Sequence, residues 1–102
     1  MRTTKLHITQ PAFEDIQDAM EWYVAQSNGL ELRFYKHLID RLKFIRANPE
    51  AAAFLDKRFR GSQLKKFPFT VYYHYNEAQD QVKIAAVLHN KRNKSVLKKR
   101  DA

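Results

Sequence analysis

The chain lacks cysteine and contains no long hydrophobic run. Without cysteine neither a disulfide framework nor a thiolate metal site can form, and a reducing compartment is compatible with the composition. No stretch of about 18 consecutive apolar residues occurs, and residues 1–10 contain no apolar segment typical of a signal peptide. These absences argue against secretion and membrane spanning, so we expect a cytoplasmic protein.

The composition is that of a folded protein. Of 102 residues, 44% are hydrophobic, and the aromatic residues comprise seven Phe, five Tyr and one Trp. Burying these aromatic side chains can offset the conformational entropy lost on folding, whereas disordered sequences have too little apolar area to do so. This length supports one hydrophobic core, and the sequence shows no internal repeat or linker. We therefore expect a single domain over residues 1–102.

The net charge of +8 is unevenly distributed. Residues 1–56 carry seven Lys and Arg against eight Asp and Glu, whereas residues 57–102 carry twelve against three. This asymmetry points to an acidic partner, which could be nucleic acid, an anionic protein surface or a membrane surface. The alternative is a solvated surface that only keeps the protein soluble.

The first half of the chain predicts a short strand and a helical hairpin. In residues 5–9, β-branched and apolar side chains alternate with polar ones, which predicts a strand that ends before Pro11. A helix capped at Thr9 or Gln10 should then extend to Gln26. Asn28 and Gly29 form the turn to a second helix, which ends at Asn48-Pro49. The expected core positions are Ile16, Ala19, Met20, Tyr23 and Val24 in the first helix and Phe34, Leu38, Leu42 and Ile45 in the second, with Tyr35 and Ile39 alongside. Asp15, Gln17, Asp18 and Glu21 should face water.

The second half predicts antiparallel strands. Residues 69–75 and 82–89 alternate clearly and are joined by a polar hairpin at 76–81, while 54–59 and 63–66 form a less regular pair around Gly61. In the later strand we expect Val82, Ile84, Ala86 and Leu88 to share one face. The fold class is thus α+β: an N-terminal strand, an antiparallel helical hairpin and a mainly antiparallel sheet of three to four strands. Helices should cover one sheet face and leave a functional surface on the other, with a basic tail from about residue 90.

A set of ordered residues supports a family resemblance. They are Ala12, Asp15-Ile16, Trp22-Tyr23, Gly29-Leu30, Phe34, Asn48-Pro49, Arg58, Phe67-Pro68-Phe69, Val71-Tyr72-Tyr73, Ala86-Val87-Leu88-His89 and Arg92. Across residues 5–93 this order resembles the RelE/ParE toxin superfamily, and the segments 67–73 and 89–92 are closer to its ParE-like, plasmid-stabilisation branch. The resemblance implies a growth-arresting toxin neutralised by a cognate antitoxin in a hetero-oligomer, with no membrane partner.

The superfamily uses two mechanisms, and the fold alone does not choose between them. ParE-like members inhibit DNA gyrase without bond-breaking chemistry, which is the leading interpretation here. RelE-like members are endoribonucleases that cut messenger RNA on the ribosome. A third alternative is a basic nucleic-acid-binding module without toxicity, because the chain lacks a tail aromatic and diverges around Arg92.

The nuclease alternative names specific residues. Metal-free RNA cleavage needs an acid, a base and cations near the phosphate. By resemblance, Arg58 and Lys65 would clamp phosphate, His89 would act as acid or base, and Arg92 would stabilise charge. Further candidates for target or phosphate binding are Arg60, Lys66, His74, Lys91 and Lys94. We expect no cofactor, and no His pair has the spacing of a metal site.

Several of these side chains also have purely structural interpretations. His89 could end a strand and hydrogen-bond a neighbouring loop, and His74 sits mid-strand among tyrosines. Tyr72, Tyr73 and Tyr75 could stack on bases, but alternation places at least two of them in the core. Trp22 and Tyr23 are expected to pack inside the helical hairpin, although an exposed aromatic there could receive an antitoxin side chain.

Overall fold

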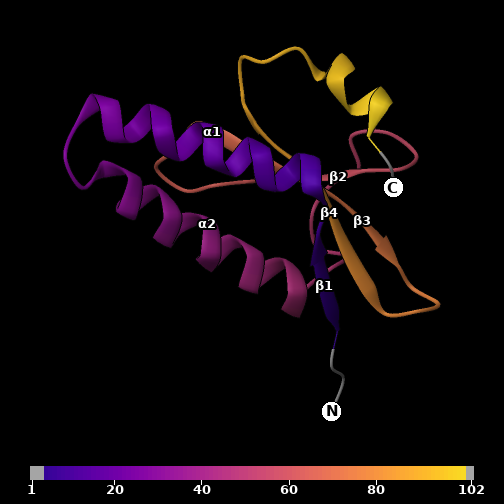
Figure 1. The fold of residues 1–102 in the computed structure, drawn as a ribbon. Helices are drawn as coiled ribbons and strands as arrows, with labels where there is room; N and C mark the ends of the chain where they lie inside the picture. Colours follow the sequence, from indigo (N-terminus) through magenta and orange to yellow (C-terminus); the bar gives the residue numbers. More distant parts are fainter. Residues whose placement is uncertain (1–3, 101–102) are drawn as a thin grey trace.

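The computed structural model describes residues 4–100 and shows an α+β fold (Figure 1). Its elements are β1 (Lys5–Ile8), α1 (Gln10–Gln26), α2 (Leu30–Ala47), β2 (Arg60–Gln63), β3 (Phe69–Asn76), β4 (Gln81–His89) and the 3₁₀ helix η1 (Lys94–Lys99). The sheet has the strand order β1-β4-β3-β2, in which β1 pairs in parallel with β4 and the other pairs are antiparallel. The predicted fold class is confirmed. Within the described residues, no helix is long and apolar enough to cross a bilayer.

The helical hairpin begins and ends where the sequence predicts. The Thr9 hydroxyl accepts the Ala12 N–H at 3.3 Å and donates to the Ile84 carbonyl at 2.9 Å, which fixes the start of α1 against β4. Gly29 has φ +84°, the left-handed conformation that glycine adopts without strain, and α2 begins at the next residue. Asn48 ends α2 by donating its backbone N–H to the Phe44 carbonyl at 2.8 Å.

The helices pack on one face of the sheet and enclose the larger core (Figure 1). Its centre is aromatic: the Phe34 ring lies 5.2 Å from Tyr23, 5.6 Å from Phe67 and 5.1 Å from Phe69 between centroids. The four core positions of α2 match the prediction, and Ile39 is partly buried beside them. Tyr35, expected alongside them, is 46% exposed, so that part of the prediction is wrong. In α1 the prediction is wrong for Val24, which is 53% exposed, because this residue lies at the edge of the apolar face.

The opposite sheet face is also covered, contrary to the expected open functional surface. A second cluster consists of Phe59, Tyr72, Ala85, Ala86, Leu88 and Leu97. Leu97 belongs to η1, so the C-terminal segment forms a lid over this face (Figure 1). Tyr72 and Tyr73 are buried on opposite faces, so neither ring is available to stack on a base.

A β-bulge changes which residues of β4 face the helices. Tyr72 pairs with Ala86 and Tyr73 with Ile84, so Ala85 is the extra residue. Val82, Ile84 and Val87 consequently lie in the helix-side core, whereas Ala85, Ala86 and Leu88 lie in the second cluster. The expected shared face of Val82, Ile84, Ala86 and Leu88 is therefore wrong beyond Ile84.

The predicted strand pair 54–59 and 63–66 is also wrong. β2 covers only Arg60–Gln63 and pairs with β3, and Phe54 makes an isolated bridge with Arg60. The preceding residues turn because the Asp56 carboxylate accepts the N–H groups of Arg58 at 2.7 Å and Phe59 at 3.0 Å. These two hydrogen bonds lower the pKa of Asp56.

Candidate binding groove beside helix α1

A groove of about 340 Å³ runs between α1 and the end of β4. Its lining residues are Asp15, Asp18, Ala19, Trp22, Phe69, Val87, His89 and Arg92. We call it the Trp22 groove. Most of the exposed lining is apolar, and the ionisable groups lie among apolar side chains. This combination is common in surfaces that receive a protein side chain.

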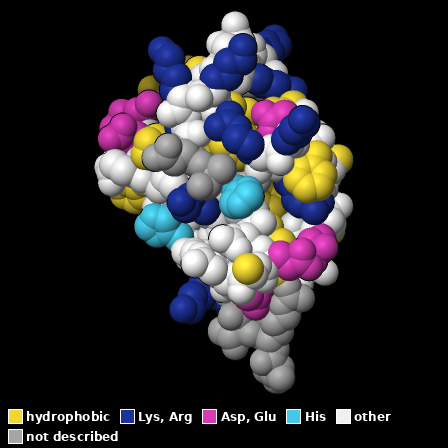
Figure 2. Space-filling model, turned by 90° about the vertical axis from the view of Figure 1, so that its right-hand side faces the viewer, with side chains coloured by type: hydrophobic (Ala, Val, Ile, Leu, Met, Phe, Trp, Pro, Cys, Tyr) yellow, Lys and Arg dark blue, Asp and Glu magenta, His cyan; other side chains and the backbone are white. Residues whose placement is uncertain are grey.

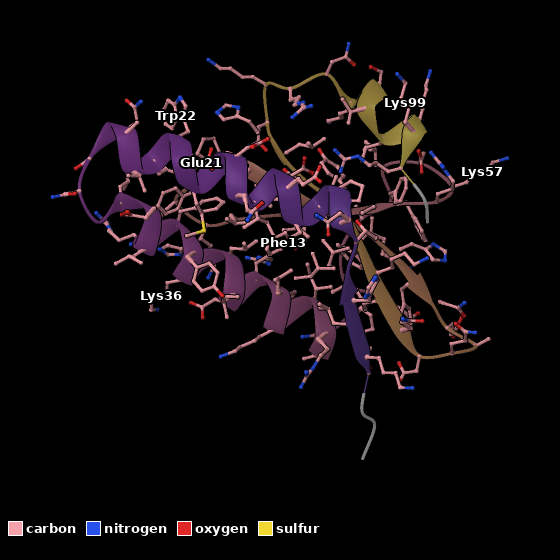
Figure 3. All side chains as sticks on the ribbon, in the orientation of Figure 1. Phe13, Glu21, Trp22, Lys36, Lys57 and Lys99 are labelled. Carbon is pink, nitrogen blue, oxygen red and sulfur yellow. The ribbon has the colours of Figure 1, made fainter. Side chains whose placement is uncertain are left out.

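Trp22 is an exposed aromatic residue in the lining of this groove. Its side chain is 59% exposed, and its ring meets the buried Tyr23 edge-on at 5.2 Å. Figure 3 shows Trp22 projecting from α1 on the side where the chain follows β4. The prediction that Trp22 packs inside the hairpin is therefore wrong, while Tyr23 packs there as expected. Burial raises the pKa of the Tyr23 phenol.

His89 and Arg92 meet at the end of β4. The His89 ring packs edge-on against Phe69 at 5.3 Å, and its Nδ1 accepts the Lys91 N–H at 3.1 Å. Since Nδ1 is an acceptor, the proton of the neutral ring lies on Nε2. The Arg92 N–H donates to the His89 carbonyl at 2.9 Å. His89 thus has the expected structural role at a strand end and also lines the groove.

Asp15, one of the residues that line the groove, forms a buried ion pair with Arg100. The Arg100 guanidinium donates to both carboxylate oxygens of Asp15, at 2.9 and 3.1 Å, and to the Ala85 carbonyl at 2.8 Å. Asp15 also accepts the Val87 N–H at 3.0 Å. Only 6% of the Asp15 side chain and 13% of the Arg100 side chain are exposed. The expectation that Asp15 faces water is wrong, because its carboxylate is buried in the ion pair with Arg100. The helix pattern around Asp15 does not show this partner, which lies 85 residues away in the sequence.

The proposed nuclease residues lie in separate places. Arg58 donates to the carbonyls of Leu97 at 3.2 Å and Arg100 at 3.4 Å, so it holds the C-terminal segment. Lys65 lines a different pocket, against α2, while His89 and Arg92 line the Trp22 groove. No described pocket contains all four of these side chains. Their catalytic roles stay predictions.

The other candidate side chains are similarly dispersed. Arg60 donates to the carbonyls of Glu50 at 3.0 Å and Ala52 at 2.7 Å and lies 3.9 Å above the Phe54 ring. His74 shares a small cavity with Arg60, and its Nδ1 lies 3.0 Å from the Arg58 carbonyl. Burial raises the pKa of the neighbouring Tyr73 despite the charge of Arg60.

The remaining lysine candidates are exposed. Lys66 has the positive φ of 66° in the β2–β3 connection, Lys91 follows β4, and Lys94 begins η1. Figure 2 shows Lys and Arg side chains crowding the upper half of one molecular face, the height at which Figure 1 places η1. Among residues 4–100, no group of three or more His, Asp and Glu side chains is arranged to hold a metal ion.

Sequence reasoning missed Asp15, Arg100 and the exposure of Trp22. One signal was present for Asp15: it lies one position before the core residue Ile16, at the border of the apolar face. Nothing in the sequence pairs it with Arg100, which is one of several cations in the tail.

Comparisons with known proteins agree with this architecture. The family model of the ParE toxin of type II toxin-antitoxin systems, parDE, matches residues 6–94. The chain therefore belongs to the ParE toxin family, within the RelE/ParE superfamily, and its family partner is an antitoxin. No curated protein sequence matches the chain.

Three solved structures share the fold. The chromosomal ParDE toxin-antitoxin system from P. aeruginosa matches with a TM-score of 0.71 and 18% identity, covering 85% of this chain and 96% of that one. The isolated E. coli RelE toxin matches with a TM-score of 0.54 and 12% identity, covering 93% of each chain. The archaeal RelE-RelB complex from Pyrococcus horikoshii matches with a TM-score of 0.57 and 11% identity, covering 90% and 100%. At these identities the likeness concerns the fold alone.

Proposed function

We propose that this toxin arrests growth by binding DNA gyrase through the Trp22 groove. The observation that carries the proposal is an exposed Trp22 beside a mainly apolar groove. Tryptophan and arginine contribute disproportionately to protein interfaces, and Arg92 lies in the same groove. The ParE family assignment supports gyrase as the protein that is bound.

The dispersal of the candidate nuclease residues supports a binding function over RNA cleavage. General acid–base catalysis requires its groups within hydrogen-bond reach of the same reacting atoms. Arg58 instead holds backbone carbonyls of the C-terminal segment, and Lys65 lines another pocket. We also propose that the antitoxin neutralises the toxin in a hetero-oligomer. Either target of the superfamily would place the protein in the cytoplasm.

The ribosome-dependent ribonuclease is the second candidate because His89 and Arg92 line one groove. An imidazole and a guanidinium that line the same groove could transfer a proton and stabilise developing phosphate charge. Under this alternative His89 is essential, whereas a gyrase inhibitor needs it only to support the groove.

The first experiment compares labelled methionine and labelled thymidine incorporation within minutes of inducing the toxin without its antitoxin. We expect thymidine incorporation to fall first, because inhibited gyrase stops replication. Early loss of methionine incorporation would place the ribonuclease ahead. Continued growth with neither loss would contradict a toxic activity.

A variant series then locates the binding surface. In a supercoiling assay with purified gyrase, Trp22→Ala should weaken inhibition by about 30-fold, the effect of losing an interface residue worth about 2 kcal/mol. Val24→Ala, which changes a residue of α1 outside the groove with a similar exposure, 53% against 59% for Trp22, is the control and should have little effect. His89→Ala should retain inhibition within about threefold, since an energetically minor interface position costs less than 1 kcal/mol. Loss of all activity in His89→Ala, together with cut messenger RNA in the parent, would refute the gyrase mechanism.

A further inference from the structure

A second pocket lies on the other side of the helical hairpin, between α2 and the β2–β3 connection. It has a volume of about 490 Å³ and is lined by His37, Asp40, Arg41, Phe44 and Lys65. The four α2 residues follow the spacing i, i+3, i+4 and i+7, so they form one stripe on the helix. We call this site the α2 pocket. The ParE assignment and the gyrase proposal leave it without a role.

The far wall of the α2 pocket is fixed by buried neighbours. Lys65 follows Leu64 and precedes Phe67 by two positions, and both of these side chains are buried in the main core. The Leu64 N–H also donates to the Phe69 carbonyl at 2.9 Å. The backbone carrying Lys65 is therefore held on both sides, although its own side chain is exposed.

The charges in the α2 pocket favour an anion. Asp40 is the one acidic side chain in the lining, and it pairs with Lys36 at 3.4 Å, a residue that Figure 3 shows projecting from α2 away from α1. Within the described part of the chain, Arg41 and Lys65 have no carboxylate within ion-pair distance. The lining therefore carries two cations, Arg41 and Lys65, against one carboxylate, Asp40, which is itself in contact with Lys36.

Arg41 is positioned for this role. One guanidinium nitrogen donates to the buried Ser62 hydroxyl at 3.4 Å, and the guanidinium carbon lies 5.1 Å from the Phe44 ring centre. A guanidinium has five N–H donors in a planar arrangement that matches phosphate oxygens, so donors remain for a ligand. Phe44 is 45% exposed, which leaves ring surface free. The pocket therefore combines phosphate donors with an aromatic surface.

We propose that the α2 pocket binds a nucleotide, with the phosphate between Arg41 and Lys65 and the base stacked on Phe44. His37, whose ring packs against Phe67 at 5.4 Å, completes the lining with a further polar group. Cations combined with an accessible aromatic ring are the arrangement that binds single strands without sequence preference. The same chemistry would accept a free mononucleotide. An acidic peptide would use the cations but gains less from the ring.

The test measures binding of the full-length protein to a fluorescein-labelled oligothymidylate of about eight nucleotides, a length within the range of single-strand sites. Thymidine monophosphate and polyglutamate serve as competitors. Phe44→Ala is matched by Phe13→Ala, which removes a ring of nearly equal exposure, 46%, from α1. Lys65→Gln is matched by Lys43→Gln, which makes the same charge change at an exposed α2 position outside the pocket. Circular dichroism melting confirms that each variant folds.

We expect Phe44→Ala to weaken oligothymidylate binding by about fivefold or more, the loss of one stacked base, while Phe13→Ala stays within about twofold. The slope of log affinity against log salt is negative, and Lys65→Gln should reduce its magnitude by about 0.7, the value for one phosphate contact on a single strand. Competition by thymidine monophosphate with an affinity equal to that of the oligothymidylate would identify a free nucleotide as the ligand, and much weaker competition would identify a single strand.

Three results would overturn the proposal. The first is an absence of oligothymidylate binding at millimolar protein. The second is an equal loss of affinity in the pocket variants and their controls, which would indicate that the oligonucleotide binds to the basic surface in general and not to the α2 pocket. The third is displacement by polyglutamate with no dependence on Phe44, which would indicate an acidic peptide. Gyrase inhibition by Phe44→Ala is measured separately and should be unchanged, so this inference and the gyrase proposal can fail independently.

Discussion

The two faces of the sheet are covered in different ways. On the helix side, two long helices bury an aromatic cluster centred on Phe34. On the other side, a short 3₁₀ segment contributes Leu97 to a smaller cluster and is held by Arg58 and by the Asp15–Arg100 pair. Buried apolar area stabilises both faces, but the cover of the second face is also held by guanidinium hydrogen bonds.

The hydrogen bonds of the second face use some of the positive charge in residues 57–102. Arg58, Arg60 and Arg100 donate to backbone carbonyls or to a buried carboxylate, so part of the positive charge serves the fold. Lysines such as Lys91, Lys94 and Lys99 remain exposed. The net charge of +8 consequently overstates the charge available to an acidic partner.

The largest expected effect comes from the aromatic core. Phe34→Ala should lower the free energy of unfolding by about 3–5 kcal/mol, because it removes a fully buried ring and leaves a cavity among Tyr23, Phe67 and Phe69. Urea unfolding followed by circular dichroism measures this change. Phe13→Ala, at an exposed position of α1, is the control. Equal losses in both variants would contradict the assigned core.

A smaller loss is expected when the cover of the second face is released. Arg100→Ala should cost about 1.5–3 kcal/mol, the range for hydrogen bonds to charged groups, since the segment can open and let water reach Asp15. The neighbouring Lys99 is exposed, so Lys99→Ala should change stability by less than about 0.5 kcal/mol. The backbone N–H of residue 100 donates to the Leu97 carbonyl at 3.1 Å, so hydrogen exchange at the backbone amide of position 100 should be faster in Arg100→Ala than in the parent and unchanged in Lys99→Ala. If the two variants behave alike, the ion pair does not hold the segment.

The smallest effect concerns the turn that precedes β2. The pKa of Asp56 is lowered by the N–H groups of Arg58 and Phe59, so its carboxylate stabilises the fold above the ordinary carboxyl pKa of about 3.9. This contribution is lost as the pH falls through the lower folded-state pKa. Asp56→Ala should therefore be less stable than the parent at neutral pH and equal to it in strong acid. Urea unfolding across this pH range tests the sign, with Glu77→Ala as an exposed control.

The parts of the fold that sequence could predict depend on local signals. The hairpin follows from the Thr9 cap, the left-handed Gly29 and the Asn48 stop, each of which acts within a few residues. The stripe of α2 follows from its spacing alone. The family resemblance was likewise visible in the ordered motifs, and the ParE family model confirms it.

The parts that failed depend on contacts distant in sequence. The buried Asp15 is paired with the Val87 N–H and with Arg100, which are 72 and 85 residues away in the sequence. The exposed Trp22 lines a groove together with residues at the end of β4. Periodicity marks a helix face but does not locate its borders in the folded molecule. For the same reason the sequence could not show that Arg58 and Lys65 lie in separate places.

The bulge at Ala85 has a consequence for comparing this strand with its relatives. From Ala86 onward the inside and outside positions are one step out of phase with those before Ala85. A relative with a regular strand lacks the residue that corresponds to Ala85, so its sequence aligns correctly only with a one-residue gap at this position. Without the gap, the alignment would match a residue that faces the helices in one protein with a residue that faces the second cluster in the other. Because the Arg100 guanidinium donates to the Ala85 carbonyl at 2.8 Å, the C-terminal segment contacts the extra residue directly, and a substitution at Arg100 would remove a hydrogen bond from the bulge itself.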